Sequence, residues 1–227
     1  TFSRQRKTLI SLTLTSNTTS TATTIAWPGG LQTGDIAIHY DLALDTNGTS
    51  TLPGDVTPSG FTSPANWGAG VNGGGGRGLR GRVSYKILTG SEVCNITGMP
   101  GVTSRQKRLM IYRGNLPIIG VTTSTTTSTA IISDPSPKVL SVPLAPALIV
   151  GMAGASNGVY SFSTASPAFD ATYTSGITTF ITGAKFYASS PASHTIDMPN
   201  PGLPTSPAVF LFAGYLELKK KKKNNAS

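Results

Sequence analysis

The segment Gly34–Leu44, which reads GDIAIHYDLAL, constrains the fold of this chain more than any other stretch. Its alternate positions carry the larger apolar side chains, namely Ile36, Ile38, Tyr40, Leu42 and Leu44. A period of two residues places these side chains on one face of a β-strand and the residues between them on the other. Turn-forming residues flank the segment at 34–35 and 45–48. We therefore predict a strand with one buried face.

The same alternation recurs in short segments that are separated by Gly, Pro, Asn, Asp or Ser. The further segments that we expect to form strands are 8–15, 23–27, 82–89, 92–97, 106–113, 116–121, 138–142, 147–152, 177–181, 184–188, 194–198 and 208–218. Residues 45–82 are expected to form mostly loop. The run ALIVGM at 147–152 is continuously apolar, which is typical of a strand buried on both faces. About ten to twelve short strands predict an all-β fold, an antiparallel β-sandwich of jelly-roll-like type.

The length of 227 residues suits one large all-β domain with a sizeable core. We predict a single β-sandwich domain over residues 8–218, a basic arm at 1–7 and a Lys-rich tail at 219–227. One cysteine, Cys94, cannot form an intrachain disulfide, so crosslinks of that kind do not stabilise the fold. No apolar run reaches about 20 residues, so no membrane-spanning helix is predicted.

The formal net charge of +9 is concentrated at the two ends of the chain. The cations at these ends are Arg4, Arg6, Lys7, Lys219, Lys220, Lys221, Lys222 and Lys223. Removing these eight cations from the total of eighteen leaves ten against nine acidic residues, so the body is nearly neutral. We predict that both basic segments anchor the protein on an acidic partner and become ordered there. A simply solvated tail is the alternative, and the absence of interleaved aromatic residues disfavours nucleic acid.

The long loop and the strand after it hold the candidate contact surface, which comprises Trp67, Arg77, Arg80 and Arg82. A Trp ring can stack on a sugar, and guanidinium groups bind carboxylates or phosphates through two hydrogen bonds. Trp67 is the preferred sugar-stacking residue because it lies in the loop. The other aromatic candidates are Trp27, Tyr85, Tyr160, Tyr173 and Tyr187. The alternative for Trp67 is an anchor that packs the loop onto the sandwich.

One segment matches the nucleophile motif G-x-S-x-G, with Ser156 at its centre. Asp170 and His194 follow in the order that a hydrolase triad requires. The chemistry needs a strand-to-helix turn that presents the serine, and the residues after the motif have no helical pattern. We therefore prefer a Gly-rich turn and predict no catalytic residues.

Two further patterns suggest ligand sites by composition. Gly68–Gly73 fits G-x-G-x-x-G, but no predicted strand precedes it and no helix follows, so we expect a flexible loop. His39 and Asp41 share one strand face, and His194 lies near Asp197, yet neither pair has diagnostic metal-ligand spacing. We therefore predict no cofactor and no metal.

Several phrases follow one another along the chain: AWPGGLQTGDIAIHYDLAL, TPSGFT, SYKILTGSE, IYRGN, ALIVGMAGAS and FLFAGYLEL. In this order they resemble β-sandwich structural proteins of tailed-phage virions. The resemblance implies a non-enzymatic protein that decorates a capsid or forms part of a tail fibre or other appendage. It also implies contacts with other virion proteins, a homo-oligomer that is frequently trimeric, and assembly into the virion in the host cytoplasm. A carbohydrate-binding module for host-surface recognition is the alternative function.

Overall fold

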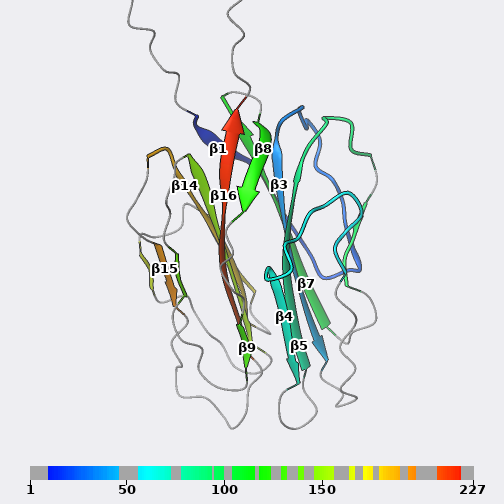
Figure 1. Cartoon of the computed structure of the whole chain (residues 1–227). Helices are drawn as coiled ribbons and strands as arrows, with labels where there is room; N and C mark the ends of the chain where they lie inside the picture. Colours follow the sequence, from blue (N-terminus) through cyan, green and yellow to red (C-terminus); the bar gives the residue numbers. More distant parts are fainter. Residues whose placement is uncertain are drawn as a thin grey trace, which may run out of the picture.

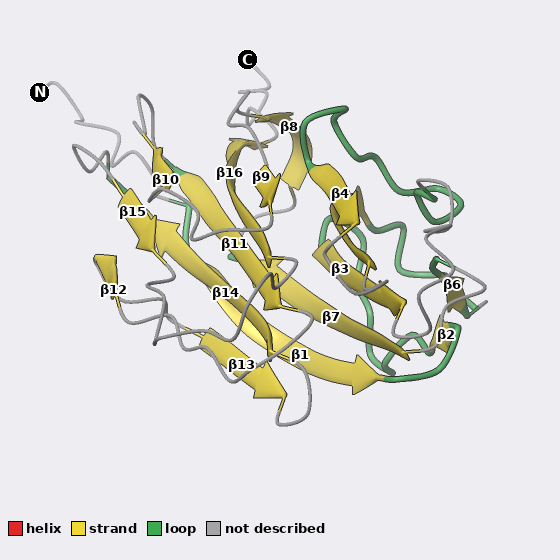
Figure 2. Cartoon of the chain, turned by 90° about the horizontal axis from the view of Figure 1, so that it is seen from below, coloured by secondary structure: helices red, strands yellow, loops and turns green. Residues whose placement is uncertain are grey.

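The computed structural model describes fourteen segments of the chain, and all structural statements concern these residues. They are 10–45, 56–72, 78–93, 95–99, 104–115, 118–123, 129–131, 138–140, 146–155, 164–166, 171–175, 179–189, 194–197 and 209–220. Every regular element within them is a β-strand, and every strand pairing is antiparallel (Figure 2). The predicted all-β, antiparallel class is confirmed.

Two large sheets face one another (Figure 1). The N-terminal sheet has the order β1 (Leu12–Ser20), β7 (Ser104–Gly114), β3 (Ile36–Asp45), β5 (Gly78–Ile87) and β4 (Gly68–Asn72). The C-terminal sheet has the order β13 (Ala171–Ser175), β14 (Thr179–Tyr187), β11 (Ala147–Ala155), β16 (Val209–Lys220) and β8 (Ile118–Thr123), and β9 (Thr129–Ile131) also pairs with β16. Each half of the chain therefore builds one sheet, and the chain passes between the two from β7 to β8.

Two smaller sheets lie on the outer sides of this sandwich (Figures 1 and 2). A three-stranded sheet of β10 (Lys138–Leu140), β15 (His194–Asp197) and β12 (Thr164–Ser166) lies outside the C-terminal sheet. The pair β2 (Thr24–Ile25) and β6 (Ile96–Thr97) lies outside the N-terminal sheet. The sandwich therefore has additional layers on both outer sides.

Large apolar side chains from both sheets fill the space between them. The core residues of the main strands are Ile36, Ile38, Tyr40, Leu42, Leu79, Val83, Met110, Tyr112, Leu148, Val150, Met152, Phe180, Ala184, Phe212, Leu216 and Leu218. Burying one such large side chain contributes about 1.5–3 kcal/mol, so this layer is the main source of stability. The apolar face predicted for β3 and the doubly buried run predicted for β11 are both confirmed.

The second face of β3 is also buried, so the prediction of one buried face is wrong. Ala37, His39, Asp41 and Ala43 on this face are at most 1% exposed. A second apolar cluster covers the face and comprises Ile25, Ala37, Phe61, Leu88, Ile96, Leu109 and Ile111. Loops and the β2–β6 pair supply several of these residues, and such long-range cover has no signature in the alternation of β3 itself.

The interior also contains a polar connection between the sheets. Tyr40 and Arg108 are cross-strand neighbours on β3 and β7. The Tyr40 hydroxyl donates to the Gly183 carbonyl oxygen at 3.0 Å, and Arg108 Nη1 donates to the Thr182 carbonyl oxygen at 3.0 Å. Burial raises the pKa of Tyr40, so the phenol stays protonated and can donate. These hydrogen bonds fix β14 of one sheet against the centre of the other.

Several strand boundaries differ from the predicted ones. Residues 45–82 contain β4 and the start of β5, although we expected mostly loop there, and β1 continues to Ser20 through a polar run. The segments 177–181 and 184–188 join into the single strand β14, with Gly183 at the centre. The Gly-rich composition of residues 45–82 led us to expect loop there, but paired strands accommodate Gly where another group approaches the backbone closely.

Candidate functional site

Trp67, the preferred sugar-stacking residue, lies inside the sandwich. Its side chain is 0% exposed, and its ring lies 5.2 Å from Phe212 and 5.9 Å from Tyr85, measured between centroids. Gly214 leaves the space for this packing, because a Cβ there would approach the indole to 3.1 Å. Trp67 therefore anchors the chain before β4, and its assignment to the contact surface was wrong.

Arg80 and Arg82 lie on the outer face of β5 beside the glycines of β4. A Cβ on Gly68 would lie 3.1 Å from Arg82 Nε, and one on Gly70 would lie 3.0 Å from Arg80 Nε. Arg82 is 7% exposed, and its Nη1 donates to Ser63 Oγ at 2.7 Å. The Gly-rich motif thus provides space for two arginine side chains, and Arg82 holds a covering loop in place instead of presenting a free cation. Arg77 lies outside the described residues.

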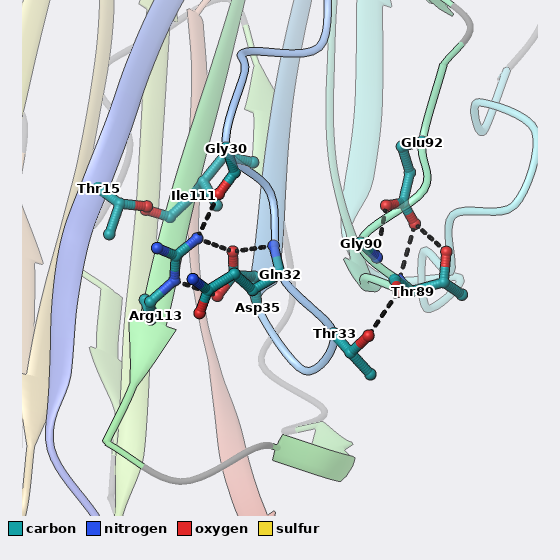
Figure 3. Close-up of polar contacts among 10 residues, drawn as sticks. All are labelled: Thr15, Gly30, Gln32, Thr33, Asp35, Thr89, Gly90, Glu92, Ile111 and Arg113. Atoms are coloured by element: carbon teal, nitrogen blue, oxygen red, sulfur yellow. Dashed lines mark hydrogen bonds and ion pairs between the residues drawn. The ribbon is translucent and has the colours of Figure 1, made fainter.

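A carboxylate-guanidinium pair secures the turn before β3 (Figure 3). Arg113 Nε donates to Asp35 Oδ1 at 2.9 Å, and Arg113 Nη2 donates to Asp35 Oδ2 at 2.7 Å. The same Nη2 donates to the Gly30 carbonyl oxygen, and the Gln32 amide donates to Asp35. The hydrogen bond to Asp35 raises the pKa of Arg113. This pair connects the end of β7 to the turn.

Glu92 organises the turn after β5 in a similar way (Figure 3). Its Oε1 accepts from the Thr89 amide at 2.9 Å, and its Oε2 accepts from the Gly90 amide at 3.1 Å. Lys86 Nζ lies 3.3 Å from Glu92 Oε1. Burial opposes ionisation of Glu92, but hydrogen bonds from Thr89 and Lys86 outweigh it and lower the pKa of this carboxyl. Glu92 is thus an ionised residue that stabilises the turn.

An open pocket of about 270 Å³ lies beside this turn. Its lining residues are Trp27, Ser59, Lys86, Glu92, Val93, Asn95, Ile96 and Thr97. The partly buried Trp27 ring stacks on Phe61 at 5.7 Å, and Lys86 Nζ lies 5.5 Å from the indole centroid. The pocket combines an aromatic wall with uncharged hydrogen-bonding side chains and the charged Lys86–Glu92 pair. We considered Trp27 but preferred Trp67, although the Pro-Gly-Gly turn after Trp27 was a signal for a surface position.

The described chain begins and ends at the same end of the sandwich (Figure 1). Leu12 pairs with Gly114 at the end of β7, and Ile118 at the start of β8 pairs with Lys220. We call this end, which Leu12, Gly114, Ile118 and Lys220 define, the terminal pole. Strand register thus places the described residues that adjoin the two basic segments in one region of the molecule.

The Lys run is partly inside the fold. Lys219 pairs with Gly120 and Lys220 with Ile118, so β16 extends two residues beyond the predicted boundary at Leu218. Lys219 is exposed. The other predicted anchoring residues are Arg4, Arg6, Lys7, Lys221, Lys222 and Lys223, and they lie outside the described residues.

A buried ion pair lies on the outer face of the N-terminal sheet. Asp41 on β3 and Lys107 on β7 are directly paired, and Lys107 Nζ lies 2.6 Å from Asp41 Oδ1. Their side chains are 2% and 0% exposed, respectively. The Met99 amide donates to Asp41 Oδ2 at 2.7 Å, and a Cβ on Gly98 would collide with both charged groups. Burial lowers the pKa of Lys107, and Asp41 opposes that effect.

His39 belongs to the same buried face, two residues before Asp41. Its ring lies 5.8 Å from Phe61, and its Nε2 has no hydrogen-bond partner among the described residues. Burial lowers the pKa of His39 to about 4, with Asp41 opposing and Lys107 reinforcing the effect. The imidazole is therefore neutral at neutral pH. We noted His39 and Asp41 only as weak metal candidates and missed Lys107, because the pairing of two distant strands was needed to find it.

The remaining predicted site residues are not tested by the structure. Ser156, Asp170 and Cys94 lie outside the described residues, and only the backbone of His194 is described. Within the described segments, no three His, Cys, Asp or Glu side chains are placed to hold a metal ion. The same segments contain no helix with the length and apolar character needed to cross a membrane.

Comparison with known proteins identified no relative of this chain. No protein-family model, curated protein or solved structure matches the chain. Function is therefore inferred from the fold, the terminal pole, the Trp27 pocket and the buried polar face.

Proposed function

We propose that this chain is a non-enzymatic structural protein of a phage virion that docks on other virion subunits through its terminal pole. The observation that carries the proposal is that the described residues nearest to both basic segments, at Leu12 and Lys220, lie at this one pole. The order of sequence phrases supports the assignment to a virion, as capsid decoration or as a tail component. In this proposal the protein enters the virion in the host cytoplasm and acts as a homo-oligomer, for which a trimer is the first expectation.

Chain reach limits how far the flanking cations can lie from the pole. Lys7 precedes Ile10 by three residues, which span at most about 11 Å when fully extended. Lys221 follows the last residue of β16 directly. The terminal pole thus combines two lysines within the sheet with six further cations on the adjoining segments. This arrangement is suited to an acidic protein surface.

Screening by salt limits the range over which such a charged surface attracts a partner. Attraction between exposed charges falls off over about 8 Å at physiological ionic strength, so the basic segments act mainly at contact. Charge complementarity also selects partners and raises the rate of association. The sandwich serves as a preorganised body, while the flanking segments supply the charge that directs its pole towards the partner.

Immunogold electron microscopy of particles from the source lysate tests the proposal. An antibody raised against the purified chain should label intact virions at the capsid or at the tail. Labelling confined to free protein, with virions unlabelled under the same conditions, would contradict a virion role.

Removal of positive charge from the Lys run tests the docking role of the pole. Replacing Lys221, Lys222 and Lys223 by Gln should reduce attachment to particles and weaken its salt dependence. The matched control replaces the same three residues by Arg, which retains the charge and should retain attachment. Equal attachment of both variants would remove the Lys run from the docking mechanism.

A carbohydrate-binding module is the second candidate function, and the Trp27 pocket is the observation that favours it. Sugar rings present apolar faces that stack on an indole and hydroxyl groups that bind neutral polar side chains. Trp27 supplies the indole, and Ser59, Asn95 and Thr97 supply hydrogen-bonding groups in the same pocket. Binding of this kind can coexist with a structural role in a virion that recognises host glycans.

Glycan-array binding tests this second function. Trp27→Ala and Asn95→Ala should each abolish binding while thermal unfolding remains cooperative. The control is Ile119→Ala, which changes a side chain that is 59% exposed and lies outside the pocket. Absence of binding by the unmodified chain across a broad array would remove the second function without affecting the virion proposal.

A further inference from the structure

We propose that Lys107 and Asp41 condense to form an intramolecular isopeptide bond that joins β7 to β3 covalently. The proposal concerns the chemistry of the buried face and is independent of the proposed virion function. It assigns a role to an ion pair that neither the terminal pole nor the Trp27 pocket uses.

The first support is the position of the two groups. Strand pairing places the residues directly opposite one another, and the amine lies 2.6 Å from a carboxyl oxygen. They are 66 positions apart in sequence, so a bond between them would close a large loop. Both side chains are almost completely buried, so the reacting groups are held together without competing water.

The second support is the local electrostatics. Amide formation requires a neutral amine and a protonated carboxyl, and a dry environment favours neutral forms. Burial lowers the pKa of Lys107, and the nearby charge of Arg105 acts in the same direction. Transfer of the ammonium proton to Asp41 within the pair yields both reactive forms. Condensation would then replace two buried charges, whose desolvation is costly, by one neutral amide.

The third support is the distribution of hydrogen bonds on Asp41. Oδ2 accepts from the Met99 amide, whereas Oδ1 is the oxygen nearest to the lysine. The amide N–H can stabilise negative charge on Oδ2 as the tetrahedral intermediate forms. Oδ1, which the Met99 amide does not contact, is the oxygen that leaves as water. Gly98 leaves room for this arrangement, since a side chain there would displace both reacting groups.

The reaction balances without any other reactant. The lone pair of neutral Nζ attacks Cγ of the protonated Asp41, and a new C–N bond forms. Oδ1 then leaves as water, which contains the hydroxyl of the acid and one proton of the amine. The product is a secondary amide that retains Oδ2, and no oxidation or reduction takes place.

Proton transfer from Nζ to the leaving oxygen is assigned to the pair itself, since the two groups are hydrogen-bonded to one another. His39 lies on the same strand face, two residues before Asp41, but its Nε2 forms no hydrogen bond with either reacting group. Phe61 packs against the imidazole from the side of the covering loop.

Intact mass spectrometry of the unmodified chain tests the bond. The measured mass should be lower than the mass calculated from the sequence by one water molecule. The Lys107→Arg variant should have the full mass calculated from its own sequence. A tryptic digest should contain a branched peptide that joins the segments around Lys107 and Asp41. The full sequence mass together with linear peptides at both sites would overturn the proposal, whether or not the variant folds.

Two controls make the result specific. Lys86 and Glu92 form a second Lys–carboxylate pair, 3.3 Å apart, in which the lysine side chain is 24% exposed. This pair should yield only linear peptides, because its lysine is accessible to water. His39→Ala should still yield the branched peptide, because the imidazole forms no hydrogen bond with either reacting group. Loss of the branched peptide in a folded His39→Ala chain would overturn the assignment of the proton transfer to the pair itself.

Discussion

At the residue scale, the main difference between expectation and structure lies in the polar side chains of β3. His39 and Asp41 occupy a strand face that looks solvent-exposed by sequence pattern, yet they are buried there with Lys107. The alternation of Ile36 and Ile38 correctly predicted which face meets the other sheet. It could not predict the second face, because the cover comes from residues that are distant in sequence.

Acidification should destabilise the fold through His39. The pKa of this imidazole is 6.5 before burial and about 4 in the folded chain, so the unfolded chain binds a proton that the folded chain does not. The free energy of unfolding should therefore fall as the pH decreases from 6.5 towards 4, by about 3 kcal/mol, and level off below that range. Urea unfolding across this range measures the loss. His39→Leu should flatten the dependence, and an unchanged slope would contradict this prediction.

Gly98→Ala should destabilise the protein, because the added methyl group would collide with Asp41 Oδ2 and Lys107 Nζ. We expect a loss of about 1–3 kcal/mol in the free energy of unfolding, the usual range for overpacking. Gly29→Ala is the matched control, since nothing lies within 4 Å of a Cβ there, and it should change stability by less than about 0.5 kcal/mol. Chemical denaturation compares the two variants, and equal effects would contradict the close packing over the ion pair.

At the element scale, the strength of the apolar signal decided which strands could be predicted. The continuous run in β11 indicated burial on both faces, and the structure confirms it. β4 was missed because Gly68 and Gly70 indicate loop by composition, whereas here they make room for Arg82 and Arg80. The Trp27 pocket could not be predicted from sequence either, because its lining segments come together only in the folded chain.

The two tryptophans should respond differently to truncation. Trp67→Ala removes a fully buried ring between the sheets and should lower the free energy of unfolding by about 3–5 kcal/mol. Trp27→Ala removes a partly buried ring at the pocket and should cost considerably less. Thermal and urea unfolding of both variants provide the comparison. A larger loss for Trp27 would contradict the assignment of Trp67 as the core anchor.

At the scale of the whole molecule, the strand pairing of the two chain halves places the described residues that adjoin the basic segments at one pole. The sequence showed that both ends are basic, but it could not show that β1 begins and β16 ends at the same pole. This placement depends on the pairing of β1 with β7 and of β8 with β16, which no local pattern reveals. The terminal pole is thus a property of the topology.

Two truncations test where the fold ends and the flanking segment begins. Ending the chain after Lys220 should leave the free energy of unfolding within about 0.5 kcal/mol of the unmodified value. Ending it after Leu218 removes the pairing of Lys219 and Lys220 with β8 and should cost about 1 kcal/mol. Urea unfolding distinguishes the two chains. Equal stability of both would place the boundary at Leu218 after all.

Cryo-electron microscopy of a particle that carries this chain tests most directly whether the sandwich works by contact at one end. We predict a map in which the end that contains Leu12, Gly114 and Lys220 faces the acidic surface of the neighbouring subunit. A map in which the opposite end, which contains the pair Asn72 and Gly78, makes that contact would contradict the account.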